Sequence, residues 1–209
     1  MRRQGKDTKR RIIDAAYELF YKDGFARAGV DAIAERAGVT KRTLYQHFDS
    51  KDALVAAVLD IQHELALTRI RAWAERACGD PVTVVDSLFA GFADWSKQRG
   101  WRGSGFTRAA MEYAASPGHP ARAAAHRHKA EVETWLAQRF AEQGVVASSQ
   151  LAREVMLLIE GCHSLVLIHR DTSYVNTASE AARLLVQWHC PDRARGQMQK
   201  ALQASAMRP

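Results

Sequence analysis

The stretch of sequence that decides the fold reads VDAIAERAGVTKRTLYQHF and runs from Val30 to Phe48. Its apolar residues recur at spacings of three and four, which predicts two short helices and not strands. Gly38 stands between the two helices, where a tight turn requires a positive φ that glycine adopts without strain. A short helix, a turn and a second short helix form the pattern of a helix-turn-helix, a motif that binds DNA.

The second of these helices has the chemistry needed to enter a major groove. Thr40 stands at its N-cap, where the hydroxyl can accept a hydrogen bond from an amide one turn later. Leu44 and Phe48 are four residues apart and anchor the helix inward. The polar side chains of the remaining positions then face outward and can reach base edges: Lys41, Arg42, Thr43 and Gln46.

Positive charge is concentrated around this motif. The chain carries a net charge of +7, and residues 1–51 hold 12 Lys and Arg against 7 Asp and Glu. The rest of the chain, with 18 against 16, is nearly neutral. This distribution fits a nucleic-acid-binding head on a near-neutral body, although a basic terminus that only aids solubility has the same composition.

Helical spacing continues through the remainder of the 209 residues, and no strand-like alternation interrupts it. We predict an all-α protein with an N-terminal three-helix domain at residues 1–52. A helical bundle follows at 53–190, and a polar tail at 191–209. The breaks between helices are expected at Gly24, Gly38, Asp49–Ser50, Cys78–Pro81, Gly100–Gly105, Ser116–Pro120, Gln143–Gly144 and Arg170–Tyr174.

Several classes of protein are disfavoured. No apolar run approaches the ~18 residues that cross a bilayer, and the basic start leads into no signal-like segment. Three cysteines far apart in sequence (Cys78, Cys162, Cys190) fit a reducing cytoplasm. His126 and His128 are two residues apart and point in different directions on a helix, so we expect no metal site and no cofactor. The absence of nucleophile, phosphate-loop and zinc-protease motifs predicts that the protein is not an enzyme.

Residues 9–54 resemble the N-terminal domain of the tetracycline-repressor (TetR) family of bacterial regulators. The resemblance rests on the order and spacing of five elements: Ile13–Phe20, Gly24-Phe25, Ile33-Ala34, Ala37–Thr40 and Leu44–Phe48, followed by Ser50–Leu54. The region beyond residue 60 resembles the family only in its pattern of helices.

The resemblance implies a role for each matched residue. It places Thr40, Tyr45, His47 and Lys51 against the phosphate backbone, which fixes register without reading sequence. It assigns base reading to Lys41, Arg42, Thr43 and Gln46. The alternatives are core packing for Tyr45 and His47 and a solvated charged face for Lys41 and Arg42. The basic arm of Arg2, Arg3, Lys6, Lys9 and Arg10 is a further candidate for DNA contact. Ala28-Gly29-Val30 departs from the family, because no hydroxyl is present there to cap the second helix.

The resemblance also implies an effector site and a dimer. Regulatory domains of this family bind small, often hydrophobic molecules, and the candidate lining residues are Trp95, Phe106, Met111, Tyr113, Trp135, Met156 and His163, each of which could equally be core. Helices near 150–169 and 176–188 are expected to pair with those of a second copy. Two recognition helices would then meet a palindromic operator on double-stranded DNA.

We therefore predict a cytoplasmic, homodimeric transcriptional repressor that a small effector releases from DNA. One alternative is an effector-independent or activating regulator with the same head. Another is a helical small-molecule carrier that has lost DNA binding. The sequence leaves open the effector, the operator and its half-site spacing, the regulated genes and the number of dimers per operator.

Overall fold

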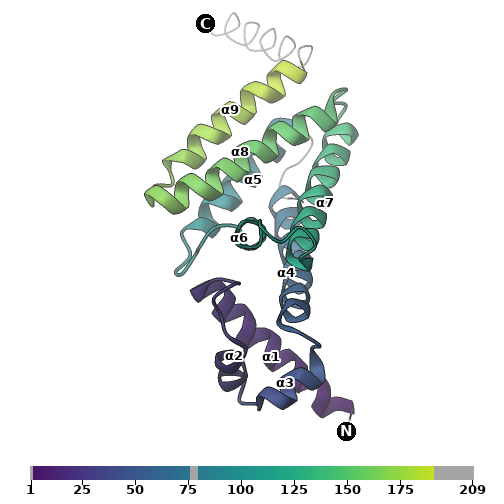
Figure 1. Cartoon of the computed structure of the whole chain (residues 1–209). Coiled ribbons are helices and arrows are strands. Elements are labelled where there is room, and N and C mark those ends of the chain that lie inside the picture. The colour runs from purple at the N-terminus through teal and green to yellow at the C-terminus, as the bar shows by residue number, and fades with distance from the viewer. Residues whose placement is uncertain (1, 76–79, 191–209) are drawn as a thin grey trace, which may run out of the picture. The chain divides into compact units, whose positions relative to one another are not determined.

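The computed structural model describes residues 2–75 and 80–190, and the side chains from residue 5 onward. In these ranges the chain forms nine helices and no strand (Figure 1). They are α1 (Arg2–Asp23), α2 (Val30–Ala37), α3 (Lys41–His47), α4 (Lys51–Glu75), α5 (Pro81–Ser96), α6 (Gly105–Glu112), α7 (Pro120–Glu142), α8 (Ser148–His169) and α9 (Ser173–His189). The all-α prediction is confirmed. The predicted tail at 191–209 lies outside the described residues.

The helices pack into two compact units. The first unit contains residues up to 68 together with 102–130, and the second contains 69–101 and 131 onward. The division falls inside α4 and inside α7, so each of these helices contributes residues to both units. The predicted boundary between the domains at 1–52 and 53–190 separates two functions and not two packing units. It remains a proposal.

The core of the first unit joins the helix-turn-helix to α4, α6 and the start of α7. Phe20 and Phe25 are fully buried and stack with their ring centroids 5.3 Å apart. The other buried side chains come from every helix of this unit: Ile12, Ala16, Ile33, Ala34, Ala37, Leu44, Leu54, Val55, Val58, Phe106, Ala109, Ala121, Ala124 and Ala125. The helix-turn-helix therefore shares one apolar core with residues from 105 to 125.

The turns of the first unit form where the local signals predict them. Gly24, after α1, has a φ of 99°, and Gly38, after α2, has a φ of 63°. Both values lie in the left-handed region that a residue with a side chain reaches only at a cost. At Gly38 the backbone N–H donates to the carbonyls of Ala34 and Glu35, which closes the end of α2. The helix-turn-helix geometry is confirmed.

The second unit is built from α5, α8 and α9, which pack against one another, with the adjoining parts of α4 and α7. Pro81 opens α5 as predicted, and Asp80 caps it by accepting from the N–H groups of Val82 and Thr83. The expected start of the last helix near 176, after a link at Arg170–Tyr174, is wrong by three residues. The Asp171 carboxylate accepts from the N–H of Ser173 at 2.8 Å, and α9 begins there.

The helix α6 was not predicted, because the Gly100–Gly105 segment reads as a break and only Phe106 and Ala109 follow as buried apolar residues. Ser104 nevertheless caps the helix by accepting from the N–H of Thr107 at 3.2 Å. Within the ranges described, none of the helices combines the length and the apolar character that crossing a membrane requires.

Candidate nucleic-acid interface

The helix α3 is fixed at both ends by the residues that the sequence points to. The Thr40 hydroxyl accepts from the Thr43 N–H at 3.1 Å, so the predicted N-cap is present. Leu44 is fully buried and Phe48 is 5% exposed. An anchored, capped helix of seven residues can present its other side chains in one defined orientation.

Most of the side chains that are predicted to contact the bases or the phosphates of DNA lie on the solvent side of α3. Lys41, Arg42 and Gln46 are exposed, and 44% of the Tyr45 surface is accessible, so core packing does not explain that tyrosine. Thr43 and His47 are half-buried. The Thr43 hydroxyl lies 2.9 Å from the Thr40 hydroxyl, which holds the two side chains against each other.

Lys41 is engaged by an acidic residue of α2. Its ammonium lies 3.0 and 3.1 Å from the two carboxylate oxygens of Asp31. This hydrogen bond to Asp31, together with the attraction of its charge, raises the pKa of Lys41. Because both side chains are exposed, the pair is weak, and a phosphate or a guanine edge can compete for the lysine.

Lys51 opens α4 and points toward the turn between α1 and α2. Its ammonium donates to the carbonyl oxygen of Ala26 at 2.7 Å. Partial burial lowers the pKa of Lys51, and the nearby charges of Asp52 and Glu112 oppose that effect. An ammonium has three hydrogens, so this bond leaves donors for an anion at the start of the helix.

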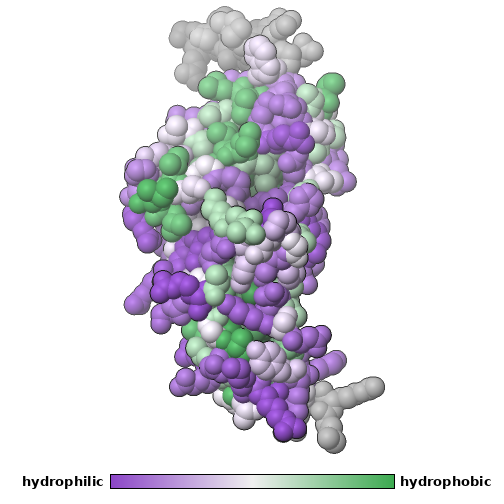
Figure 2. Space-filling model, in the orientation of Figure 1, coloured by the Kyte–Doolittle hydropathy of each residue, from purple (hydrophilic) through white to green (hydrophobic). Residues whose placement is uncertain are grey.

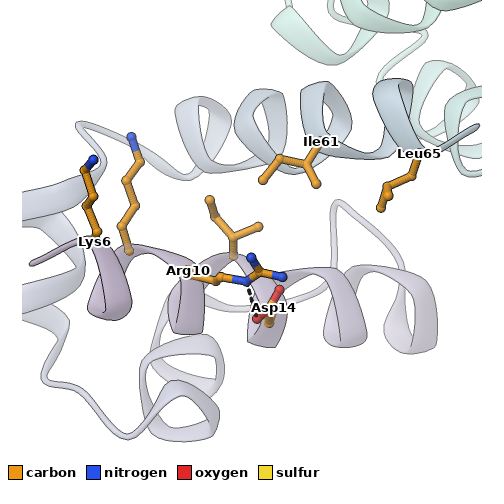
Figure 3. A pocket seen from close by; sticks show the side chains of 7 residues that line it. Lys6, Arg10, Asp14, Ile61 and Leu65 are labelled. Atoms are coloured by element: carbon orange, nitrogen blue, oxygen red, sulfur yellow. Dashed lines mark ion pairs between the residues drawn. The ribbon is translucent and has the colours of Figure 1, made fainter. Parts of the chain in front are cut away.

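The basic arm borders an open groove between α1 and α4, with a volume of about 480 Å³ (Figure 3). Lys6, Lys9 and Arg10 supply its positive charge, and the partly exposed Ile61 and Leu65 supply its apolar wall. Arg10 pairs with Asp14 at 3.8 Å, one turn later on α1. The Lys9 ammonium lies 5.3 Å from the centre of the Phe48 ring, at the C-terminal end of α3. The structure thus brings Lys9 of the arm next to the end of α3.

Sequence reasoning missed Arg11. Its guanidinium donates to the carbonyl oxygens of Ala37 and Gly38, the latter at 3.0 Å. These bonds tie α1 to the turn between α2 and α3. Their partners lie 26 and 27 residues away in sequence, so no local pattern could have shown them. Gly29 is the N-cap residue of α2. It makes no side-chain cap, as its lack of a hydroxyl implies.

The candidate effector residues divide between the two units. Phe106, Met111 and Tyr113 belong to the first unit, where Phe106 stacks on His128 and Met111 is 69% exposed. The Tyr113 hydroxyl donates to the carbonyl of Phe25 at 3.2 Å. These contacts give Phe106 and Tyr113 structural roles, and an effector role for the three residues remains a prediction.

The other four candidates belong to the second unit: Trp95, Trp135, Met156 and His163. Trp95 and His163 have ring centroids 5.8 Å apart. They belong to a group of rings that we call the aromatic cluster, made of Trp73, Phe92, Trp95, Trp101 and His163. In the part of the chain that the structure describes, no group of three or more His, Cys, Asp or Glu side chains could hold a metal ion.

Comparison with known families shows which proteins the first unit resembles. The family model of bacterial regulatory proteins of the tetR family matches residues 12–58. TtgR of Pseudomonas putida, an HTH-type transcriptional regulator, is 48% identical over 61 residues, which are 29% of this chain and 29% of TtgR. UidR of Escherichia coli, another HTH-type transcriptional regulator, is 39% identical over 71 residues, covering 34% of this chain and 36% of UidR. The aligned stretches thus span only 29% and 36% of these two relatives' own lengths.

Solved structures extend the likeness to the whole fold. A TetR-family transcriptional regulator from Streptomyces coelicolor covers 90% of this chain and 96% of its own, with a TM-score of 0.74 and 24% identity. A TetR transcriptional regulator from Chloroflexus aurantiacus covers 88% of this chain and 96% of its own, with a TM-score of 0.75 and 21% identity.

Fold and site therefore define the first unit as a helix-turn-helix domain similar to that of bacterial regulatory proteins. More narrowly, the chain carries the N-terminal domain of the tetR family of bacterial regulatory proteins, on a fold that solved TetR-family regulators share.

Proposed function

We propose that the protein is a DNA-binding transcriptional regulator whose recognition element is α3. The observation that carries the proposal is the Thr40-capped helix, held inward by Leu44 and Phe48, with Lys41, Arg42 and Gln46 exposed on its outer side. The match of residues 12–58 to the tetR family supports the same reading. A helix of this kind fits a B-form major groove, which is about 12 Å wide.

The side chains of this interface have two roles in the proposal. Lys41, Arg42, Thr43 and Gln46 read bases, since Arg and Lys pair with guanine, Gln with adenine and a Thr methyl with thymine. Thr40, Tyr45, His47 and Lys51 donate to phosphate oxygens and set the register. Lys6, Lys9 and Arg10 add phosphate contacts from α1.

The proposal includes a homodimer formed through α8 and α9. These neighbouring helices carry large apolar side chains that are exposed in a single chain, namely Leu157, Leu165, Ile168, Leu184 and Trp188. Trp188 alone is 79% exposed. Figure 2 shows apolar patches over the part of the surface where α8 and α9 lie. Exposed apolar patches of this kind are typical of an interface, and a two-fold dimer presents two recognition helices to a palindrome.

The regulator acts as a repressor in the cytoplasm, and a small molecule bound to the helical body at 53–190 releases it from the operator. Such release requires the effector to bind the non-DNA-binding conformation more tightly than the other. A 150-fold loss of operator affinity needs about 3 kcal/mol of differential binding.

The experiment that tests the proposal is selection of bound sequences from a random pool of duplex DNA. We expect enrichment of a palindrome with half-sites spaced to match the two α3 helices, and an affinity that falls steeply with salt. Recovery of unenriched sequence, or binding that is insensitive to salt, would show that α3 does not serve this function.

A further inference from the structure

The aromatic cluster surrounds one buried indole. The Trp101 ring is 8% exposed. Its centroid lies 6.1 Å from that of Phe92, 5.8 Å from that of Trp95 and 6.4 Å from that of His163. The Phe92 and Trp95 rings meet it edge-on, whereas the His163 ring is within 16° of parallel. Trp101 is therefore enclosed by the faces and edges of three other aromatic rings.

The indole N–H of Trp101 has no acceptor among the residues that the structure describes. Its Nε1 atom is inaccessible to solvent, and among the residues described no oxygen or nitrogen lies in position to accept its hydrogen. A buried donor without a partner destabilises a folded chain, so native structures pair nearly all such groups with protein, water or ligand atoms. A Trp used only for packing could be a Phe, which has no donor to bury.

The chemistry around Trp101 restricts what can accept this hydrogen. The guanidinium of Arg69 lies over the Trp95 ring, 4.4 Å from its centre, and 6.0 Å from that of Trp73. A cation of the kind that aromatic cages hold would meet this positive charge and offers no acceptor to Trp101. On the other side of the cluster, the Glu160 carboxylate lies 3.5 Å from Nδ1 of His163. A flat aromatic anion that lies on the Arg69 side satisfies both requirements, since its oxygen accepts from the indole and its ring packs against the cluster.

The cluster reaches the surface of the second unit. Trp73 and Trp95 are only half-buried, unlike Trp101. Trp73 packs on the bare backbone of Gly91, where an added Cβ would lie 2.3 Å from the ring. The exposed parts of Trp73 and Trp95 are therefore the parts of the cluster that a ligand would contact first.

We propose that the aromatic cluster binds an aromatic carboxylate, with Trp101 Nε1–H as the donor to its oxygen and Arg69 as the source of positive charge. The inference rests on the proposed function in one respect only, because it takes this ligand to be the effector. The binding site itself does not depend on DNA recognition.

Calorimetric titration of the full chain with benzoate, 2-naphthoate and indole-3-carboxylate tests the site. Naphthalene serves as a probe of similar shape without an acceptor. We expect at least one carboxylate to bind, and to bind ~10-fold more weakly to Trp101→Phe, which keeps a ring and removes the N–H. Tyr174→Phe, which removes a polar hydrogen from a half-buried aromatic side chain of the second unit outside the cluster, should bind as the unsubstituted chain does.

Each outcome of the titrations bears on one part of the proposal. Equal affinities for the unsubstituted chain and Trp101→Phe, preference for naphthalene, or no binding by any of the three carboxylates would overturn the proposal. If Trp101→Phe unfolds, as circular dichroism would show, the comparison of 2-naphthoate with naphthalene on the unsubstituted chain decides alone. If the carboxylate binds through Trp101 but leaves operator affinity unchanged, the site stands and the effector-release part of the proposed function fails.

Discussion

The carboxylate of Glu112 accepts the backbone N–H of Ala26 at 2.8 Å, although the two residues are 86 positions apart in sequence. Glu112 ends α6, and Ala26 lies in the turn between α1 and α2. Beside this bond, Arg108 of the same helix donates to the carbonyl of Tyr21 at 3.1 Å. The turn that orients the helix-turn-helix is therefore held by a helix from a distant part of the chain, within the same unit.

Glu112→Ala should destabilise the protein by roughly 1 kcal/mol, because the backbone N–H of Ala26 loses a charged acceptor in a bond that is exposed to solvent. Urea unfolding followed by circular dichroism measures the change. Glu142→Ala is the matched control, since Glu142 also ends a helix but makes only an exposed pair with Arg139. That control should change stability by less than about 0.5 kcal/mol. Equal effects of the two substitutions would contradict the role given to Glu112.

Thr40→Ala should lower stability by about 1 kcal/mol, because the N–H of Thr43 loses its acceptor at the start of α3. Operator affinity should fall as well, since the helix that carries the exposed lysine and arginine frays. Thr40→Ser keeps the hydroxyl and should restore both quantities. Gel shifts and urea unfolding measure them, and a serine variant as weak as the alanine variant would exclude the capping explanation.

Asp31→Asn should strengthen DNA binding, roughly threefold at low salt, because it releases Lys41 from its ion pair and removes a negative charge near the phosphates. The gain should shrink as salt is raised. Asp94→Asn makes the same charge change in the second unit, where Asp94 pairs with Lys97. Fluorescence anisotropy with a labelled duplex compares the two variants. An equal gain in affinity from both variants would show that the effect comes from net charge alone and not from the pair of Asp31 with Lys41.

The local features of the first unit could be predicted because each depends on a few adjacent residues. Gly24, Gly38 and Thr40 specify turns and a cap through their own backbone or side chain, and the structure confirms all three. Periodicity at three and four residues likewise identified the long helices. The helix α6 escaped prediction because eight residues with few buried apolar positions give too weak a period.

The contacts that hold the site in place could not be predicted. Arg11 to Gly38 and Glu112 to Ala26 join residues that only the fold brings together. The same holds for the pairing of Lys41 with Asp31, ten residues away. The seven candidate effector residues illustrate the limit most clearly. Helical spacing alone does not separate Phe106, which stacks on His128 in the first unit, from Trp95 in the aromatic cluster.

Leu184→Glu should convert a dimer into a monomer, because it places a charge in the exposed apolar face that we assign to the interface of α8 and α9. Sedimentation velocity at micromolar concentration measures the change. Val146→Glu is the control, since Val146 is 98% exposed between α7 and α8, outside that face. A Leu184→Glu variant that sediments as the unsubstituted chain does would exclude this interface.

Cys162 should resist alkylation in the folded protein. Burial raises the pKa of its thiol to about 11, so only ~0.1% is thiolate at pH 8. Cys190 is partly exposed and should react with iodoacetamide before Cys162 at that pH. Labelling of Cys162 should increase as the pH rises toward its pKa, and in urea both cysteines should react. Mass spectrometry of the peptides distinguishes them, and comparable rates in the folded state would contradict the prediction.

The central claim is that α3 reads DNA sequence, and the most direct test is the ratio of affinities for the selected palindrome and for a scrambled duplex of the same composition. We predict a large ratio for the unsubstituted chain and a ratio near one for Lys41→Ala with Arg42→Ala, while Lys97→Ala with Arg139→Ala keeps the large ratio after an equal loss of charge. An unchanged ratio in the Lys41 and Arg42 double variant would contradict the account.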